Sequence, residues 1–213
     1  MSGDVKQGFP AMEGGIGPLY PVVDDVRWIA QLLPLGVKTV QLRIKDPAHP
    51  ELEAQIIEAI RLGRAYQAQV FINDYWQLAL KHGAYGIHLG QEDLDIADLD
   101  ALRAAGIRLG VSTRTAAELQ RGMAIAPSYV AIGHIFPTPT KEMPTPPQGV
   151  AQLSEHLATV GGRFPTVAIG GIDLTNVDAV WQTGVSSIAV VRAVTVAPDT
   201  AQALLAFADK LVR

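Results

Sequence analysis

Short apolar runs recur eight times along the chain, each five to eight residues long and most of them rich in valine and isoleucine. They lie at 19–23, 37–44, 69–73, 86–90, 108–112, 129–133, 166–170 and 187–191. Runs of this length that end in polar residues or glycine are typical of buried strands. The segments between them carry apolar residues at helical spacing, as at Leu52, Ile56 and Ile60. The pattern therefore predicts eight strands that alternate with helices.

This alternation predicts an α/β fold, a single (β/α)8 TIM barrel. The alternative is an open doubly wound sheet, which usually has about five to seven strands and a glycine-rich nucleotide-binding motif. No G-x-G-x-x-G motif follows the first run, so the barrel is favoured. We expect the barrel domain to span residues 19–213. Residues 1–18 hold five glycines and two prolines without the apolar stretch of a signal peptide, which predicts a flexible N-terminal tail.

The two faces of the predicted strands differ in side-chain size, because alternate residues of a strand point to opposite sides. The bulkier face suits packing against helices and comprises Leu42, Ile44, Ile87, Leu89, Leu109, Val111, Val130, Ile132, Val167, Ile169, Ile188 and Val190. The smaller face comprises Gly86, Gly90, Gly110, Ala131, Gly133, Ala168, Gly170 and Ala189. Bulky side chains normally fill a barrel, so a small inward face predicts a ligand cavity. The alternative is that Phe71 and Val23 fill the space.

Composition narrows the class of protein. The 213 residues are 48% hydrophobic and 18% charged, which excludes intrinsic disorder. The net charge of −4 argues against a general nucleic-acid or anionic-membrane partner, although a local basic cluster is compatible with it. The absence of cysteine excludes disulfides, thiolate catalysis and cysteine-based zinc sites. No apolar run approaches the roughly 20 residues of a membrane span, so we expect a cytoplasmic enzyme of small molecules. A homo-oligomer is compatible with the sequence, which does not fix the oligomeric state.

Three polar residues share one face of the second predicted strand. Gln41, Arg43 and Lys45 alternate there with apolar residues, so all three would point into the barrel mouth. Burying two unpaired cations would cost several kcal/mol each, which predicts an anion nearby. The alternative is that internal ion pairs with Asp74 or Asp93 neutralise them.

Carboxylates follow the third and fourth predicted strands. Asn73 and Asp74 end one run, and Asp93 comes just after the next. The carboxyl ends of neighbouring barrel strands meet at one rim, where active sites form. Two carboxylates beside basic groups suit Mg²⁺ shared with a phosphate-bearing substrate. The alternative is that Asp74 and Asp93 only cap helices that begin near Tyr75 and Ile96.

The segment 137–149 holds five prolines in 13 residues, which precludes a helix. A loop of this length in a compact barrel is often a lid, and Thr138, Thr140 and Lys141 offer groups that bind phosphate oxygens. The alternative is a stiff surface connection.

The ends of the last two predicted strands indicate a second anion site. Gly170 and Gly171 follow one run and Arg192 follows the other, and loops in these positions commonly bind phosphate through backbone N–H groups. Ser112 ends the fifth run, between the two anion sites. His88 is predicted either to face the cavity or to be a hydrogen-bonded core residue. The expected surface histidines are His49, His82 and His156.

These residues lie in segments that together resemble the thiamine phosphate synthase family. The segments are QLRIK at 41–45, FINDYWQLA at 71–79, GIHLGQEDL at 86–94, LGVST at 109–113, YVAIGHIFPTPTK at 129–141, VAIGGI at 167–172 and GVSSIAVV at 184–191. The resemblance implies a (β/α)8 barrel that joins hydroxymethylpyrimidine diphosphate to a thiazole phosphate, giving thiamine phosphate and pyrophosphate. A carboxylated thiazole phosphate that loses CO₂ is the alternative acceptor. The implied mechanism is dissociative, with pyrophosphate leaving before the thiazole nitrogen attacks a pyrimidine methylene cation.

The resemblance also implies a role for each site residue. Asp74 and Asp93 would hold Mg²⁺, the implied cofactor, on the diphosphate. The pyrimidine diphosphate would be bound by Gln41, Arg43, Lys45, Asn73 and Lys141, with Ser112 near the reacting pyrimidine. The thiazole phosphate would be bound by Thr138, Thr140, Gly170 and the backbone of Val190 and Val191. Catalysis would rest on Arg43, Ser112 and Lys141.

Two positions depart from the family pattern. The family often has histidine where this chain has Arg114, and serine where it has Arg192. The role of Arg192 is left open, since it could add charge at the second anion site or point outward. Two rival functions also remain, a thiazole tautomerase and a non-catalytic phosphate-ligand sensor on the same barrel. The paired carboxylates and the cations argue against both.

Overall fold

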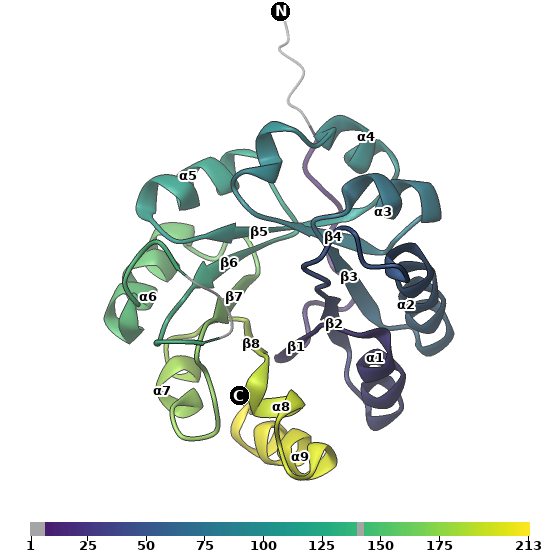
Figure 1. Cartoon of the computed structure of the whole chain (residues 1–213). Helices are drawn as coiled ribbons and strands as arrows, with labels where there is room; N and C mark the ends of the chain where they lie inside the picture. The colour runs from purple at the N-terminus through teal and green to yellow at the C-terminus, as the bar shows by residue number, and fades with distance from the viewer. Residues whose placement is uncertain (1–6, 140–142) are drawn as a thin grey trace, which may run out of the picture.

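The computed structural model describes residues 7–139 and 143–213 and forms a closed barrel of eight parallel strands in the order β1 to β8 (Figure 1). The strands are β1 (Leu19–Val23), β2 (Thr39–Leu42), β3 (Gln69–Asn73), β4 (Gly86–Leu89), β5 (Arg108–Thr113), β6 (Tyr129–Gly133), β7 (Thr166–Ile169) and β8 (Ser187–Val190). Closure comes from β1 pairing with β8 as well as with β2. The barrel prediction is confirmed, and closure rules out the open sheet.

Helices follow the strands and surround the barrel (Figure 1). They are α1 (Val26–Leu32), α2 (Leu52–Tyr66), α3 (Trp76–His82), α4 (Leu99–Ala104), α5 (Ala116–Ala124), α6 (Gly149–Val160), α7 (Val177–Trp181), α8 (Arg192–Thr195) and α9 (Thr200–Lys210), with 3-10 turns η1 (Leu33–Leu35) and η2 (Asp93–Asp95). Their apolar faces pack on the bulky outer face of the strands to form the main core. Within the described residues, the structure has no helix with the length and apolar character of a membrane span.

The orientation of β7 differs from the prediction. Val167 and Ile169 face the barrel interior, and Ala168 lies in the outer core. The cause is the register with β6, which pairs Ala131 with Val167. Paired residues in a barrel wall face the same side, so the inward Ala131 turns Val167 inward too. The prediction from side-chain size therefore assigned the wrong residues of β7 to the barrel interior.

Part of the small inward face makes room for aromatic rings. A Cβ atom on Gly86 would overlap the Phe71 ring, and one on Gly110 would overlap the Tyr129 ring. Phe71 and Tyr129 pack edge to face with centroids 5.2 Å apart, and Tyr20 lies beside both. The expectation that all the small residues border a cavity is wrong at Gly86 and Gly110. The alternative was correct for Phe71.

The other half of the interior stays open. Ala131, Gly133 and Ala189 face this space from β6 and β8. Val23, which was expected as an alternative filler, packs instead in the outer core. The aromatic rings thus form a floor, and the ligand cavity begins above it.

Residues 7–18, which precede β1, cover the amino-terminal end of the barrel, below the aromatic floor. Phe9 and Met12 are buried, with 7% and 6% exposure, and Met12 packs with the aromatic floor. Backbone carbonyls of this segment accept hydrogen bonds from Ser128 Oγ (2.6 Å) and from Gln69 Nε2 (3.0 Å). Residues 7–18 therefore differ from the flexible tail predicted from their composition. Residues 1–6 lie outside the described residues.

Candidate active site

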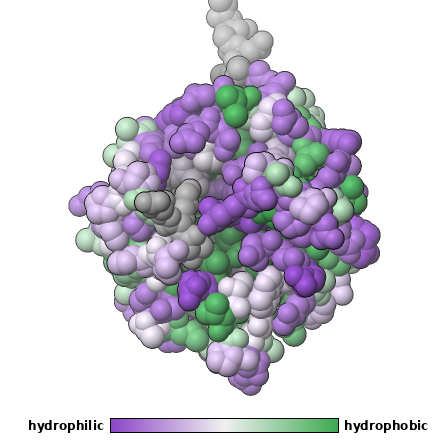
Figure 2. All heavy atoms as spheres, in the orientation of Figure 1, coloured by the Kyte–Doolittle hydropathy of each residue, from purple (hydrophilic) through white to green (hydrophobic). Residues whose placement is uncertain are grey.

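A cavity of about 810 Å³ opens at the carboxyl ends of the strands, a size typical of small-molecule sites. The face seen in Figure 2 is largely hydrophilic, with smaller hydrophobic areas between the polar residues. Ten of the sequence-predicted site residues line the cavity: Gln41, Arg43, Asn73, Asp74, Asp93, Ser112, Thr138, Gly170, Val190 and Val191. Lys45 is exposed beyond β2 and is not among the lining residues that the structure describes. Thr140 and Lys141 lie outside the described residues.

Arg43 and Asp74 form the charged wall beside β2 and β3. Burial lowers the pKa of Arg43, and the negative charge of Asp74 opposes that shift. The guanidinium stays charged at neutral pH because its ordinary pKa lies far above 7. A partly buried cation at the cavity wall favours an anionic ligand.

The backbone orients Asp74 in an uncommon conformation. Its φ is +71°, a left-handed region that aspartate tolerates better than most residues. The Asp74 N–H donates to the His88 carbonyl at 3.1 Å, which ties the end of β3 to β4. The N-cap of α3 is Tyr75, so the helix-cap alternative for Asp74 does not hold. Asp98 caps α4 instead of Asp93, through a 2.9 Å bond from Ala101 N–H.

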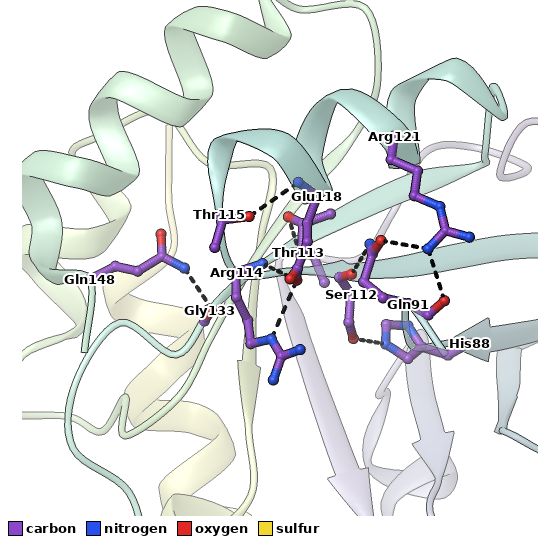
Figure 3. Close-up of polar contacts among 11 residues, drawn as sticks. His88, Gln91, Ser112, Thr113, Arg114, Thr115, Glu118, Arg121, Gly133 and Gln148 are labelled. Atoms are coloured by element: carbon purple, nitrogen blue, oxygen red, sulfur yellow. Dashed lines mark hydrogen bonds and ion pairs between the residues drawn. The ribbon is translucent and has the colours of Figure 1, made fainter. Parts of the chain in front are cut away.

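Asp93 begins the short turn η2. Arg121 on α5 contacts residues on both sides of Asp93, and Figure 3 shows its contact with Gln91. Arg121 donates to the Gln91 carbonyl at 3.2 Å and forms an ion pair with Asp95. Gln91 Nε2 in turn donates to the Ser112 carbonyl at 2.9 Å. Sequence reasoning missed Arg121, because only folding brings α5 beside the segment after β4.

His88 faces the interior from β4 and is buried, with 7% exposure. Its Nε2 lies 2.6 Å from Ser112 Oγ, and its Nδ1 lies 2.7 Å from the Tyr129 hydroxyl (Figure 3 shows the Ser112 contact). Burial raises the pKa of the Tyr129 hydroxyl well above its usual value, so this group stays protonated. Both predicted alternatives for His88 are thus partly met, since it is hydrogen-bonded in the core and also lines the cavity.

The opposite wall is formed by residues that follow β7 and β8. Gly170 has φ +111°, and a Cβ there would overlap His134, so glycine is required. Gly171, at φ +66°, packs as closely against Phe136 and Pro137. Arg192, at the start of α8, is among the residues that line the cavity.

Two further cavity residues were missed or misread from sequence. His134, after β6, is 6% exposed, and its Nδ1 has no hydrogen-bond partner within the described residues. Burial and the charge of Arg114 lower the pKa of His134, which favours the neutral imidazole. Arg114 donates through Nε to Glu118 at 3.3 Å, so its charge is partly compensated (Figure 3). Counting one residue beyond the sixth apolar run would have found His134.

Two histidines differ from the surface placement predicted for them. His156 is buried on α6 with 6% exposure, because it falls on the helix face that packs inward. His82, at the end of α3, is half-buried and lies 2.7 Å from Glu53.

Comparison with known proteins assigns the barrel to a family. The sequence model of the family described as "Thiamine monophosphate synthase" matches residues 19–194, most of the chain. The chain belongs to this family. A thiamine-phosphate synthase of Pectobacterium atrosepticum is 64% identical over 185 residues, which cover 87% of each chain. One of Serratia proteamaculans is 58% identical and covers 92% of each. The chain is therefore a transferase of thiamine biosynthesis.

Solved structures agree with this assignment. The thiamine phosphate pyrophosphorylase of Pyrococcus furiosus superposes with a TM-score of 0.78 at 29% identity, covering 91% of this chain and 94% of that one. A 3-hexulose-6-phosphate synthase superposes with a TM-score of 0.67 at 15% identity, covering 92% of this chain and 100% of that one, which shows a shared fold alone.

Proposed function

We propose that the chain condenses hydroxymethylpyrimidine diphosphate with a thiazole phosphate to give thiamine phosphate and pyrophosphate. The observation that supports this most is the layout of one cavity. Arg43, Asp74 and Asp93 lie at the ends of β2 to β4, and Gly170 and Arg192 lie on the opposite wall. Two anionic groups, a diphosphate and a monophosphate, fit two separated anion sites around an apolar middle.

Asp74 and Asp93 would hold Mg²⁺ on the diphosphate. Both carboxylates border the same cavity, and hard oxygen ligands suit this ion. No group of three or more histidine, aspartate or glutamate side chains with metal-binding geometry occurs among the described residues. A two-carboxylate site fits an ion that takes its remaining ligands from water and substrate phosphates. Mg²⁺ bound there would offset negative charge on the diphosphate.

The residues of this chain support a dissociative substitution. The bond between the pyrimidine methylene carbon and the diphosphate oxygen breaks, and its electron pair leaves with pyrophosphate. Arg43 offsets the charge that develops on this leaving group, a form of preorganised electrostatic stabilisation. The thiazole nitrogen then donates its lone pair to the methylene carbon to form the new C–N bond. The small side chains of Ala131 and Ala189 leave room for the two planar rings.

The acceptor is the thiazole phosphate or its carboxylated form, which loses CO₂. Gly170 and the backbone of Val190 and Val191 would bind its phosphate, and Arg192 adds a positive charge that the family pattern lacks. Thr140 and Lys141 lie outside the described residues, so their phosphate contacts stay predictions. The cytoplasmic location, the absence of nucleic-acid and membrane partners and the compatibility with a homo-oligomer stay predictions too.

A coupled synthesis assay tests the function. The purified chain is incubated with pyrimidine diphosphate and thiazole phosphate, and both thiamine phosphate and pyrophosphate are measured. We expect both products with Mg²⁺ and neither with EDTA. Asp93→Asn should lower the rate by at least about a hundredfold, since a charged ligand of the leaving group's metal is lost.

The result separates the candidate functions. No thiamine phosphate in the presence of Mg²⁺ would contradict the synthase and leave the tautomerase or the sensor. Equal rates in EDTA, or an unimpaired Asp93→Asn variant, would contradict the metal assignment alone. Asp178→Asn is the matched control, because Asp178 pairs with Lys210 at the surface and is not among the described residues that line the cavity.

A further inference from the structure

A chain of hydrogen bonds crosses the barrel on top of the aromatic floor. It runs from Gln41 Nε2 to the Tyr20 hydroxyl (3.1 Å), to the Tyr129 hydroxyl (2.8 Å), to His88 Nδ1 (2.7 Å) and from His88 Nε2 to Ser112 Oγ (2.6 Å). These residues come from five different strands, and both ends of the chain line the cavity. The family roles given above include Gln41 and Ser112 and leave the three residues between them without a role.

The donor at one end sets the direction of every bond. An amide nitrogen can only donate, so Gln41 Nε2 donates to the Tyr20 hydroxyl oxygen. The Tyr20 hydroxyl still has its own hydrogen to donate, and among the described residues the Tyr129 oxygen accepts it. Tyr20 is 1% exposed, and a buried hydroxyl hydrogen without an acceptor would cost about 1–3 kcal/mol. The Tyr129 hydroxyl therefore accepts from Tyr20 and donates onward.

The same reasoning fixes the protons of the imidazole. Tyr129 is fully buried, and among the described residues His88 Nδ1 accepts the Tyr129 hydroxyl hydrogen. A neutral imidazole that accepts at Nδ1 carries its proton on Nε2. His88 Nε2 thus donates to Ser112 Oγ, and the Ser112 hydrogen is left to point elsewhere. Because Ser112 lines the cavity, that direction includes a bound ligand.

We propose that Tyr20 and Tyr129 are positioning residues that hold His88 in its Nε2–H tautomer and so leave the Ser112 hydroxyl to donate into the cavity. The acceptor is an atom of the pyrimidine diphosphate, and this part of the inference rests on the proposed function. With the opposite direction, Ser112 would donate to His88 and present only lone pairs to the ligand. The direction therefore decides whether Ser112 stabilises electron-rich or electron-poor atoms.

The tautomer can be measured without any turnover. Protein labelled with ¹⁵N-histidine gives long-range ¹H–¹⁵N correlations that distinguish the two neutral tautomers, and a His88→Gln sample assigns the His88 signals. We expect the Nε2–H pattern for His88 in the wild type. Tyr129→Phe and Tyr20→Phe should each shift the signals toward a mixture with Nδ1–H. Tyr129→Phe removes the donor to His88 Nδ1, and Tyr20→Phe removes the hydroxyl that obliges Tyr129 to donate to it.

Tyr85→Phe is the matched control. Tyr85 packs against the same floor, with its ring centroid 5.9 Å from that of Phe71, but its hydroxyl accepts from Glu13 N–H outside the chain of bonds. It should keep the wild-type His88 pattern. Use of two tyrosine variants keeps the test valid if one of them fails to fold, as judged by circular dichroism and thermal unfolding.

Activity gives the second measurement. Tyr129→Phe should lower kcat/KM for the pyrimidine diphosphate about tenfold, the effect of one hydrogen bond of ordinary strength, whereas Tyr85→Phe should not. An Nδ1–H pattern in the wild type would overturn the inference. Identical His88 signals in the wild type, Tyr129→Phe and Tyr20→Phe would overturn it as well. Failure of the proposed function would appear separately, as absence of thiamine phosphate while the tautomer pattern still holds.

Discussion

Two interior glycines carry no side chain because aromatic rings occupy that space. Gly86 lies against Phe71 and Gly110 against Tyr129. Their strand positions were predicted correctly, but their small size was interpreted as room for a ligand. The small size of a residue on one strand does not show which side chain occupies the space beside it, because that side chain comes from another strand. At the scale of single residues, the sequence therefore located the interior without showing what fills it.

Gly110→Ala should destabilise the fold by about 1–3 kcal/mol, the usual effect of overpacking a core. The added methyl group must displace the Tyr129 ring, and activity should fall with stability because Tyr129 contacts His88. Urea unfolding measures the free energy of unfolding. Gly90→Ala is the control, since its Cβ would meet Asp93 Oδ2 at 3.9 Å, an ordinary contact. Equal stability of Gly110→Ala and the wild type would contradict the account of the floor.

At the scale of elements, the rim segments are held by bonds from neighbouring helices. The segment between β4 and α4 carries Asp93, and Arg121 on α5 bonds to Gln91 and Asp95 on either side of it. This arrangement follows from the order of the barrel, in which each rim segment lies beside the next βα unit. The sequence predicted that Asp93 reaches the rim, whereas the contact that holds it there required the fold.

Arg121→Leu should raise the Mg²⁺ concentration for half-maximal synthesis about tenfold, as loss of outer partners of a metal site commonly does. Its effect on thermal stability should be small, because exposed ion pairs contribute less than about 1 kcal/mol. Arg61→Leu provides the comparison, since it removes a similar exposed pair, with Glu58, on α2. An unchanged Mg²⁺ dependence in Arg121→Leu would show that Arg121 does not support Asp93.

At the scale of the whole molecule, the barrel is closed at one end by its own N-terminal segment. Met12 packs against the aromatic floor, and the Arg108 guanidinium donates to the Ala11 carbonyl at 3.3 Å and pairs with Glu13 at 3.1 Å. The floor is thus enclosed between this segment and the cavity. The glycine-rich composition of this segment predicted a flexible tail. Composition does not reveal the contacts that the segment makes with residues roughly 60 to 120 positions away in the chain.

Met12→Ala should lower the free energy of unfolding by about 2–5 kcal/mol, the range for truncating a buried methionine. Urea titration of the full chain measures the change. Glu13→Ala should cost less than about 1 kcal/mol, because Glu13 is 80% exposed in its ion pair. If the two variants were equally stable, the segment would not be part of the core.

The sequence by itself determined the barrel and named ten residues that line the cavity. Strand runs and helical spacing are local patterns, and in a parallel barrel every strand ends at the same rim, so residues such as Asp74, Asp93 and Ser112 could be placed before the fold was known. Only the tertiary structure decided the inward phase of β7, the aromatic floor and the burial of His156. Each of these depends on the register or packing between segments that are distant in sequence. The same holds for the hydrogen bonds from Gln41 to Ser112, which exist only once the barrel closes.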